Sequence, residues 1–198
     1  MEAVPIPVSE ALETAPETAK QDADNDLAKR AASDAEAFAE LYVRHREQVF
    51  RYLRARCRDE DDALELTAVT FEKALRAMHR YRPRAGGLRA WLVRIARNAA
   101  VDEHRRRRPL TNEADMDTSL ASADPSPEEV AIASDDRRRL RGMVAALPDL
   151  QRDAVAMRYA AGLTAREIGL VIGKSEEATQ KLVSRAVAQL KETYRDQS

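Results

Sequence analysis

The chain has 198 residues, enough for one medium-sized domain or two small ones, and its net charge is −1. That near-neutral total hides a strong segregation of charge: residues 1–33 carry −4, residues 34–108 carry +6, residues 109–136 carry −8 and residues 137–198 carry +5. Two basic blocks separated by an acidic segment indicate two modules that each touch an anionic surface, joined by a spacer that does not.

Cysteine and histidine usage excludes several classes of protein. Cys57 is the only cysteine, so no intramolecular disulfide framework can form and a reducing compartment is the natural interpretation. The three histidines are scattered, without the spacing of a metal site. The first thirty residues lack the pattern of a secretion signal, and no apolar run reaches membrane-spanning length. We therefore expect a cytoplasmic protein with no membrane insertion, no metal and no cofactor.

The first part of the chain predicts an arm and two helices. Residues 1–32 have no lasting apolar period, which predicts a disordered acidic arm. Ser33 and Glu36 form a Ser-x-x-Glu capping box, and an apolar stripe then predicts a helix to about Arg56. After a polar break at residues 58–61, steps of four, three, four and three predict a second helix. Its inward stripe is Leu64, Ala68, Phe71, Leu75 and Met78.

A loop and a basic helix follow. Residues 82–87 contain one proline and two glycines and predict a loop. Residues 88–108 predict a helix with an apolar face, on which Trp91 serves packing rather than base stacking, and with four consecutive arginines at its end. The apolar face comprises Trp91, Leu92, Ile95, Ala96 and Ala99. Four adjacent arginines exceed what a helix dipole needs, which favours a phosphate partner.

The C-terminal part predicts a linker and further helices. Residues 110–125 are polar, acidic and small, which predicts a flexible linker. A cap, a first-turn proline and an acidic residue at positions 126–129 predict a helix that continues to Pro148, with Leu140 and Val144 on its inward side. A further helix is expected over residues 149–160, with Leu150, Val155 and Tyr159 inward. No β pattern occurs, so the sequence predicts an all-α fold.

Residues 164–190 predict a helix-turn-helix. Thr164 and Glu167 form a capping box, Gly169 is small where a crossing helix presses close, and Gly173 can end the short helix. The longer helix, capped by Ser175, is expected to turn inward Ala178, Leu182, Ala186 and Leu190. An ordinary αα-hairpin is the alternative. In a DNA-reading helix-turn-helix, five outward side chains enter the major groove, and which of them reads a base stays open: Glu177, Gln180, Lys181, Ser184 and Arg185.

Taken in order, these parts resemble a bacterial RNA polymerase sigma factor of the sigma-70 family, extracytoplasmic-function (ECF) type. Four stretches between Phe38 and Leu190 carry the resemblance: Phe38-Ala-Glu-Leu-Tyr with Val49-Phe50-Arg51-Tyr52-Leu53; Asp62-Ala63-Leu64-Glu65-Leu66-Thr67 with Thr70-Phe71; Arg89-Ala90-Trp91-Leu92 with Ile95-Ala96-Arg97-Asn98 and Asp102; and Leu147-Pro148 through the helix-turn-helix. The resemblance implies a non-enzymatic protein of two small helical domains. These are a sigma-2-like bundle at residues 33–109 and a sigma-4-like helix-turn-helix domain at residues 126–198, joined by the linker.

The resemblance also implies three binding surfaces. Residues that match the segment for the β′ clamp helices of core polymerase are Asp62, Glu65, Leu66, Thr67 and Phe71; Glu65 and Val69 depart from the usual aspartate and glutamate. Residues implied in recognition and melting of the −10 element are Tyr81, Arg82, Arg84, Trp91, Arg94, Arg97, Asn98 and Arg105. Residues implied in −35 recognition, within helix-turn-helix residues 164–187, are Lys174, Ser175, Glu177, Gln180, Lys181, Ser184 and Arg185; Thr179 and Gln180 depart from the usual apolar and basic residues. The second domain would rest on the β flap, and an anti-sigma factor is a further partner that the resemblance suggests.

Three other hypotheses remain. A stand-alone helix-turn-helix regulator explains residues 137–198 but gives no purpose to the segments around Phe71 and Trp91. A nuclease would need the acids of residues 59–62 to converge on a metal, whereas on one helical turn they point around the axis, and acids at a helix start are explained by the dipole. A purely structural helical protein has no use for the segregated charge.

Overall fold

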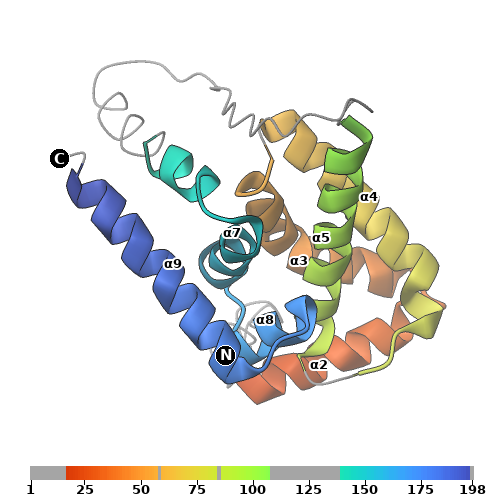
Figure 1. Cartoon of the computed structure of the whole chain (residues 1–198). Helices are drawn as coiled ribbons and strands as arrows, with labels where there is room; N and C mark the ends of the chain where they lie inside the picture. The colour runs from red at the N-terminus through yellow and green to blue at the C-terminus, as the bar shows by residue number, and fades with distance from the viewer. Residues whose placement is uncertain (1–16, 58, 84–85, 108–138, 197–198) are drawn as a thin grey trace, which may run out of the picture.

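The computed structural model describes residues 17–57, 59–83, 86–107 and 139–196, and all the regular elements among them are helical. The N-terminal part contains α2 (Glu17–Arg30), α3 (Ala35–Arg54), α4 (Glu60–Ala77), the short 3₁₀ turn η1 (Met78–Arg80) and α5 (Gly87–Arg107) (Figure 1). The C-terminal part contains helical residues 139–145, α7 (Asp149–Val155), the π-helical turn η2 (Ala156–Ala160), α8 (Ala165–Ile172) and α9 (Glu176–Asp196). The predicted all-α class is confirmed. The predictions for residues 1–16, for the linker at 110–125 and for a helix start at Ser126 lie outside the described residues.

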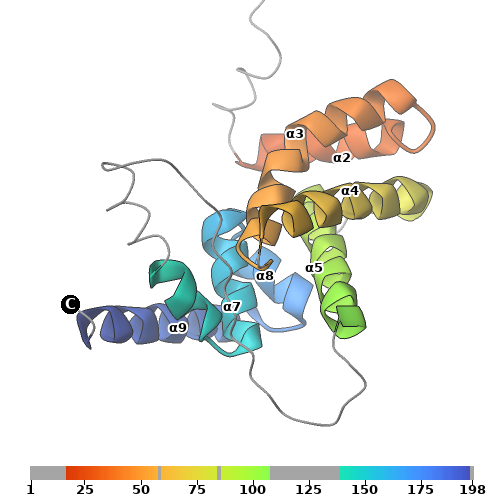
Figure 2. The same ribbon diagram turned by 90° about the horizontal axis from the view of Figure 1, so that it is seen from above.

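Helix α2 shows that the prediction of a disordered arm is wrong for residues 17–30. Figure 2 shows α2 beside α3, against which it packs with Leu27, Ala28 and the following Ala31, all at most 3% exposed. Asp24 is 6% exposed and accepts a 3.0 Å hydrogen bond from Arg44 of α3. A few apolar side chains and the polar contacts of Asp24 and Asn25 hold this helix in place, so hydrophobic periodicity does not reveal it.

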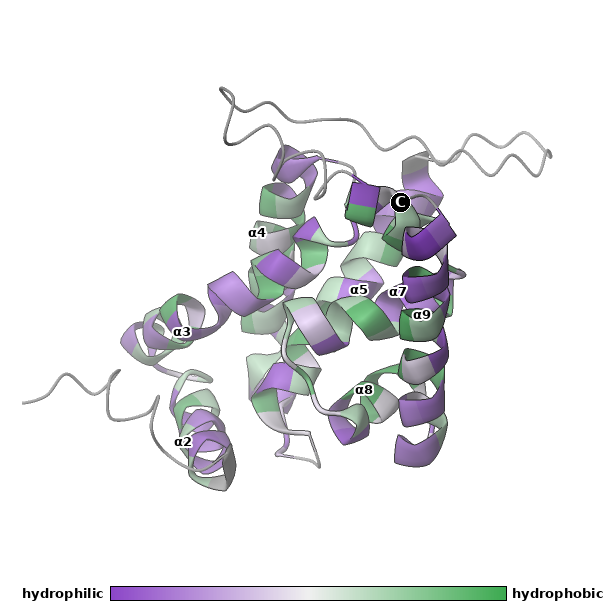
Figure 3. Ribbon diagram, turned by 90° about the vertical axis from the view of Figure 1, so that its left-hand side faces the viewer, coloured by the Kyte–Doolittle hydropathy of each residue, from purple (hydrophilic) through white to green (hydrophobic). Residues whose placement is uncertain are grey.

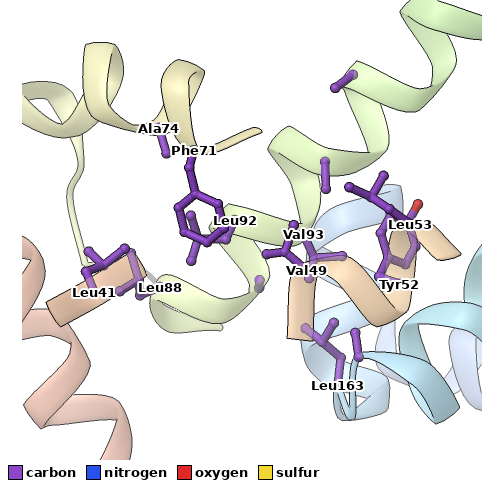
Figure 4. Packing of buried hydrophobic residues seen from close by; sticks show 14 of the residues in the cluster. Leu41, Val49, Tyr52, Leu53, Phe71, Ala74, Leu88, Leu92, Val93 and Leu163 are labelled. Carbon is purple, nitrogen blue, oxygen red and sulfur yellow. The ribbon is translucent and has the colours of Figure 1, made fainter. Parts of the chain in front are cut away.

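The core of the N-terminal part forms where α3, α4 and α5 meet. Figure 4 shows its packing, and its large side chains include Leu41, Val49, Tyr52, Leu53, Phe71, Leu88, Leu92 and Val93. Burial of each large aliphatic side chain contributes about 1.5–3 kcal/mol. The predicted apolar face of α5 is confirmed at Leu92, Ala96 and Ala99, whereas Trp91 and Ile95 are only partly buried at its margin.

On α4 the predicted inward stripe is wrong at three of its five positions. Leu64 and Leu75 are 53% and 52% exposed, and Ala68 is exposed as well. The buried face is instead Ala63, Leu66, Thr67, Thr70, Phe71 and Ala74. The hydroxyls of the two threonines donate to carbonyls one turn earlier in the helix, so these side chains are buried without unpaired polar groups. Large apolar side chains of α4 are therefore left on the surface.

Four smaller predictions also need correction. Asp34, and not Ser33, caps α3, and its carboxylate accepts from the backbone N–H of Glu36 at 2.9 Å. Leu140 is 51% exposed, and Tyr159 is 66% exposed because the wider π-helical turn of η2 changes the register after Val155. In α9 the inward position is Thr179, which is fully buried, while Ala178 is exposed.

The C-terminal part lies against α3 and α5, and the two parts share one core. Met157, Leu163 and Ile168 are fully buried in the same cluster as Val49 and Tyr52. Leu163 lies below Val49 and Tyr52 in Figure 4. A second, smaller cluster formed by residues 147, 155, 186 and 190 holds α7 against α9. This packing places α5 and α8 next to each other.

Candidate nucleic-acid interfaces

A polar and basic stripe runs along the exposed side of α5. Arg94, Asn98 and Arg105 are exposed and fall within about 40° of one another around the helix axis at 100° per residue. The opposite side of the helix is buried in the core. The stripe can therefore meet phosphates or bases while the apolar side keeps the helix fixed.

Arg97 belongs to the same predicted set but has a different environment. It lies about 60° from Arg94 around the axis, toward the C-terminal part of the chain. Its Nε donates a 2.7 Å hydrogen bond to Oδ2 of Asp153 in α7, whose side chain is 3% exposed. In this conformation Arg97 is held by a carboxylate and does not extend from the surface.

The loop before α5 is held by aromatic and polar contacts. Tyr81 is 7% exposed, and its ring packs edge-on against Trp91 with 5.1 Å between centroids. Arg82 is exposed, with Nη1 3.0 Å from the carbonyl of Tyr81, and Arg84 lies outside the described residues. Gly86 adopts a φ of 97°, where a Cβ would lie 2.9 Å from Leu170 of α8. The loop also borders a cleft of about 380 Å³, which is lined on its other sides by residues of α2, the start of α5 and α8 with its cap.

The helix-turn-helix has the geometry that its sequence predicts. Thr164 and Glu167 form a reciprocal capping box, and Gly173 ends α8 in the left-handed region at φ 71°. A Cβ on Gly169 would lie 2.6 Å from the carbonyl of Lys174, so the turn requires glycine there. Ser175 Oγ accepts from the N–H of Ala178 and begins α9. The sequence predictions of cap, glycine turn and second helix are confirmed.

All seven residues predicted for −35 recognition are exposed on α9 or just before it. They are Lys174, Ser175, Glu177, Gln180, Lys181, Ser184 and Arg185. Figure 3 shows that hydrophilic residues dominate α9. Glu177 and Lys181 form a 2.6 Å ion pair one turn apart, which orients both side chains along the helix. Because its inner side is fixed on α7 and α8, α9 presents this face as a rigid unit.

The five residues predicted for polymerase binding divide into two groups. Glu65 is exposed and Asp62 is half-buried at the start of α4. Leu66, Thr67 and Phe71 are 6%, 6% and 4% exposed and pack in the core. Any surface contact of this segment therefore involves the two acids and their exposed neighbours rather than the three buried side chains.

Two segments of the sequence match known family models. The family model described as Sigma-70 region 2 matches residues 41–109, and the one described as Sigma-70, region 4 matches residues 137–190. The ECF RNA polymerase sigma factor SigK of Mycobacterium sp. (strain KMS) is 35% identical over 146 residues, which span 72% of this chain and 75% of SigK. The chain belongs to the ECF sigma factors. It therefore directs transcription initiation with RNA polymerase and is not an enzyme.

Further relatives agree with this family. The ECF RNA polymerase sigma factor BldN of Streptomyces coelicolor is 33% identical over 169 residues; the match spans 83% of this ECF sigma factor and less than two thirds, 63%, of BldN. CnrH, solved in complex with the cytosolic domain of CnrY, has a TM-score of 0.69 at 26% identity and covers 89% of this chain and 99% of its own. RpoE of Bartonella quintana, solved with the anti-sigma factor NepR, shares the fold at a TM-score of 0.65 and 22% identity, over 80% of this chain and 96% of its own.

Two features of this sigma factor escaped the sequence prediction. One is Asp153, an acid inside a predicted helix whose partners lie more than 50 positions away. The other is the exposure of Tyr42 and Val43 on α3 and of Leu64 and Leu75 on α4, of which Leu64 and Leu75 were assigned to the core. The signal for the second was present, because Ala63, Thr67 and Thr70 trace an alternative stripe of small side chains.

The described residues contain neither a membrane-spanning helix nor a cluster of metal ligands. Within those ranges no helix is both long and apolar enough to cross a bilayer. No three histidine, cysteine, aspartate or glutamate side chains among the same residues are grouped so that they could hold a metal ion.

Proposed function

We propose that this sigma factor contacts promoter DNA with two separate surfaces while a third surface binds core polymerase. The exposed stripe of α5 and the loop that ends at Gly87 engage the −10 element, and the outward face of α9 reads the −35 element. The observation that carries this proposal is the exposure of both DNA-facing sets on rigid helices whose opposite sides are buried. Since RNA polymerase and chromosomal DNA are its partners, the activity belongs in the bacterial cytoplasm.

The two surfaces suit different tasks. Opening a duplex unpairs and unstacks bases at a cost of a few kcal/mol, which is offset when an extruded base is seated and phosphates meet cations. Arg94 and Arg105 supply cations, and the Tyr81–Trp91 pair is an aromatic wall beside the loop. Helix α9 supplies duplex readout, since Gln180 fits adenine and Arg185 fits guanine or phosphate.

The polymerase surface is assigned to the exposed side of α4, from Asp62 near its start to Leu75 near its end. Glu65 is exposed there, and Leu64 and Leu75 expose about half of their surface to solvent. Tyr42 is 37% exposed and packs edge-on against Phe71 with 4.8 Å between ring centroids. A surface that combines exposed leucines with acids fits a helical protein partner, the β′ clamp helices, and the C-terminal part would rest on the β flap.

An anti-sigma factor is a further proposed partner. RpoE was solved with the anti-sigma factor NepR, and the CnrH structure contains the cytosolic domain of CnrY. A similar partner for this chain would have to cover its polymerase or promoter surfaces. Pull-down with and without core polymerase distinguishes such a partner from the polymerase itself.

The test is footprinting of open promoter complexes formed with core polymerase. Replacing Arg94 and Asn98 by alanine should reduce reactivity of unpaired −10 thymines toward permanganate about tenfold or more while leaving −35 protection in place. Replacing Gln180 and Arg185 by alanine should remove −35 protection first. Lys29→Ala, on the exposed side of α2, is the control and should change neither. Equal loss of both footprints in the two variants would refute the division of labour.

A further inference from the structure

Helix α2 contacts both ends of the loop that precedes α5. At one end, the phenol of Tyr81 donates a 2.7 Å hydrogen bond to Oδ1 of Asn25. At the other end, the side chain of Gln21 covers the backbone of Gly87, where an added Cβ would lie 2.6 Å from Gln21 Nε2. Gln21 and Asn25 are one turn apart on the same side of α2. One face of this helix therefore meets both ends of the loop.

This face differs from the one that docks α2 on α3. Asp24 and Leu27 are 6% and 1% exposed, and Asp24 accepts a hydrogen bond from Arg44 of α3. At about 100° per residue, Gln21 and Asn25 lie about 40° apart around the helix axis, and both lie at least about 60° from Asp24 and Leu27. Docking of α2 on α3 therefore does not depend on the hydrogen bond between Asn25 and the loop.

Two contacts together fix the position of the Tyr81 side chain. Its ring packs edge-on against Trp91 with 5.1 Å between centroids, and its hydroxyl is held by Asn25. Ring packing alone permits several positions of the phenol, whereas a hydrogen bond is restricted to a narrow range of distance and angle. A surface that receives an extruded base binds it best when its walls are already in place, because ordering them on binding costs affinity. The bond to Asn25 supplies that order in advance.

We propose that α2 supports the −10 surface and that Asn25 is a positioning residue, which acts on the −10 element through Tyr81. This inference rests on the proposed function, because that function assigns Tyr81 to the −10 surface. Helix α2 precedes residues 41–109, which match the region 2 model. The part of this sigma factor that prepares promoter opening therefore begins before the matched region.

The first test follows the aromatic pair in the full chain without DNA. Trp91 is the only tryptophan, so its fluorescence reports on this loop alone. Asn25→Leu has the same branched shape but no acceptor, and it should raise the rate of acrylamide quenching of Trp91 about twofold or more, because Tyr81 no longer stays against the indole. Asn25→Asp keeps an acceptor oxygen at the same place and should be quenched like the parent. Equal quenching of the parent and folded Asn25→Leu would overturn the inference.

A matched leucine substitution separates positioning from a general loosening of α2. Lys29→Leu places the same side chain at an exposed position one turn later in the helix and should leave the quenching of Trp91 unchanged. Both leucine variants should keep the helical circular-dichroism spectrum of the parent, because Leu27 still docks α2. Equally increased quenching in Lys29→Leu would overturn the positioning role of Asn25.

The second test measures promoter opening by the full chain with core polymerase. Asn25→Leu should lower the permanganate reactivity of −10 thymines about tenfold, because a misplaced wall seats the extruded base poorly, while −35 protection and binding to core polymerase stay unchanged. Asn25→Asp should restore the reactivity. Normal opening by Asn25→Leu, under conditions in which Arg94→Ala/Asn98→Ala fails to open the promoter, would overturn the inference. Normal opening by Arg94→Ala/Asn98→Ala would instead refute the proposed function, and the fluorescence test would still decide whether Asn25 positions Tyr81.

Discussion

The phenol of Tyr81 donates a 2.7 Å hydrogen bond to Oδ1 of Asn25, which joins the loop before α5 to the middle of α2. The Tyr81 ring also packs edge-on against Trp91. The aromatic pair proposed to border the −10 surface is therefore positioned by a helix outside the residues that match the region 2 model. Disturbing α2 should disturb this loop.

Tyr81 should ionise at a much higher pH than a free tyrosine. Burial, assisted by the negative charge of Asp24, raises the pKa of Tyr81 to about 12. Below pH 10 the phenol is neutral in both states, and between pH 10 and about 12 only the unfolded chain ionises, so stability falls as pH rises. Ultraviolet titration should show a step near pH 12 that Tyr81→Phe removes. Tyr194→Phe should leave that step in place, and a Tyr81 midpoint near pH 10 would contradict the burial.

Leu27 should be important for stability although it lies outside the matched family regions. Its side chain is 1% exposed between α2 and the rest of the bundle. Leu27→Ala should lower the free energy of unfolding by about 2–5 kcal/mol, as measured by urea denaturation. Lys29→Ala, at an exposed position two residues later in the same helix, should change the free energy of unfolding by no more than about 0.5 kcal/mol. Equal effects of the two substitutions would mean that α2 is not docked.

Acid should weaken the attachment of α2 through Asp24. Burial raises the pKa of this carboxyl, but hydrogen bonds and charges from His45 and Arg44 outweigh burial, so the pKa lies below its ordinary value of 3.8. A depressed folded-state pKa gives stability that is present above pH 3.8 and is lost as pH falls through the folded-state pKa. Asp24→Asn should therefore be less stable than the parent at pH 6. That difference should shrink as pH falls below 3.8, and a constant difference would contradict the ion pair.

Substitution of the two glycines of the helix-turn-helix should lower stability for different reasons. At Gly169 an added Cβ meets backbone at 2.6 Å, so Gly169→Ala should cost about 1–3 kcal/mol of stability through overpacking. At Gly173 the space is open but φ is +71°, so Gly173→Ala should cost about 1 kcal/mol through backbone strain alone. Gly173→Asn should recover part of that loss, because asparagine tolerates this region. Equal recovery by asparagine at Gly169 would be inconsistent with a steric cause.

Local signals predicted the helix-turn-helix well because its determinants are close in sequence. The capping box at Thr164, the glycine at position 173 and the cap at Ser175 each act within four residues. The α5 helix was predicted for the same reason, since a long apolar stripe ends in a basic run. These elements carry the residues proposed to contact DNA.

What the sequence did not reveal depends on contacts between distant segments. The docking of α2 depends on the pairing of Asp24 with residues 20 or more positions away. The spacing of apolar residues in the sequence does not indicate such a pairing. The sequence prediction placed the large side chains Leu64 and Leu75 on the inward face of α4. In the structure the tightly packed inward face consists mostly of small side chains, and it buries Thr67 and Thr70 with their hydroxyls hydrogen-bonded. The contact of α7 with the N-terminal part depends on Asp153, whose partners are Tyr52 of α3, Arg56 just after it and Arg97 of α5.

Run-off transcription with purified core polymerase tests the central claim most directly. The template library should carry varied −35 and −10 sequences, and transcripts should be counted with and without the full chain. We predict new transcripts that begin downstream of a shared pair of elements and that vanish when the chain is omitted. Core polymerase whose transcript starts do not change when the chain is added would contradict the account.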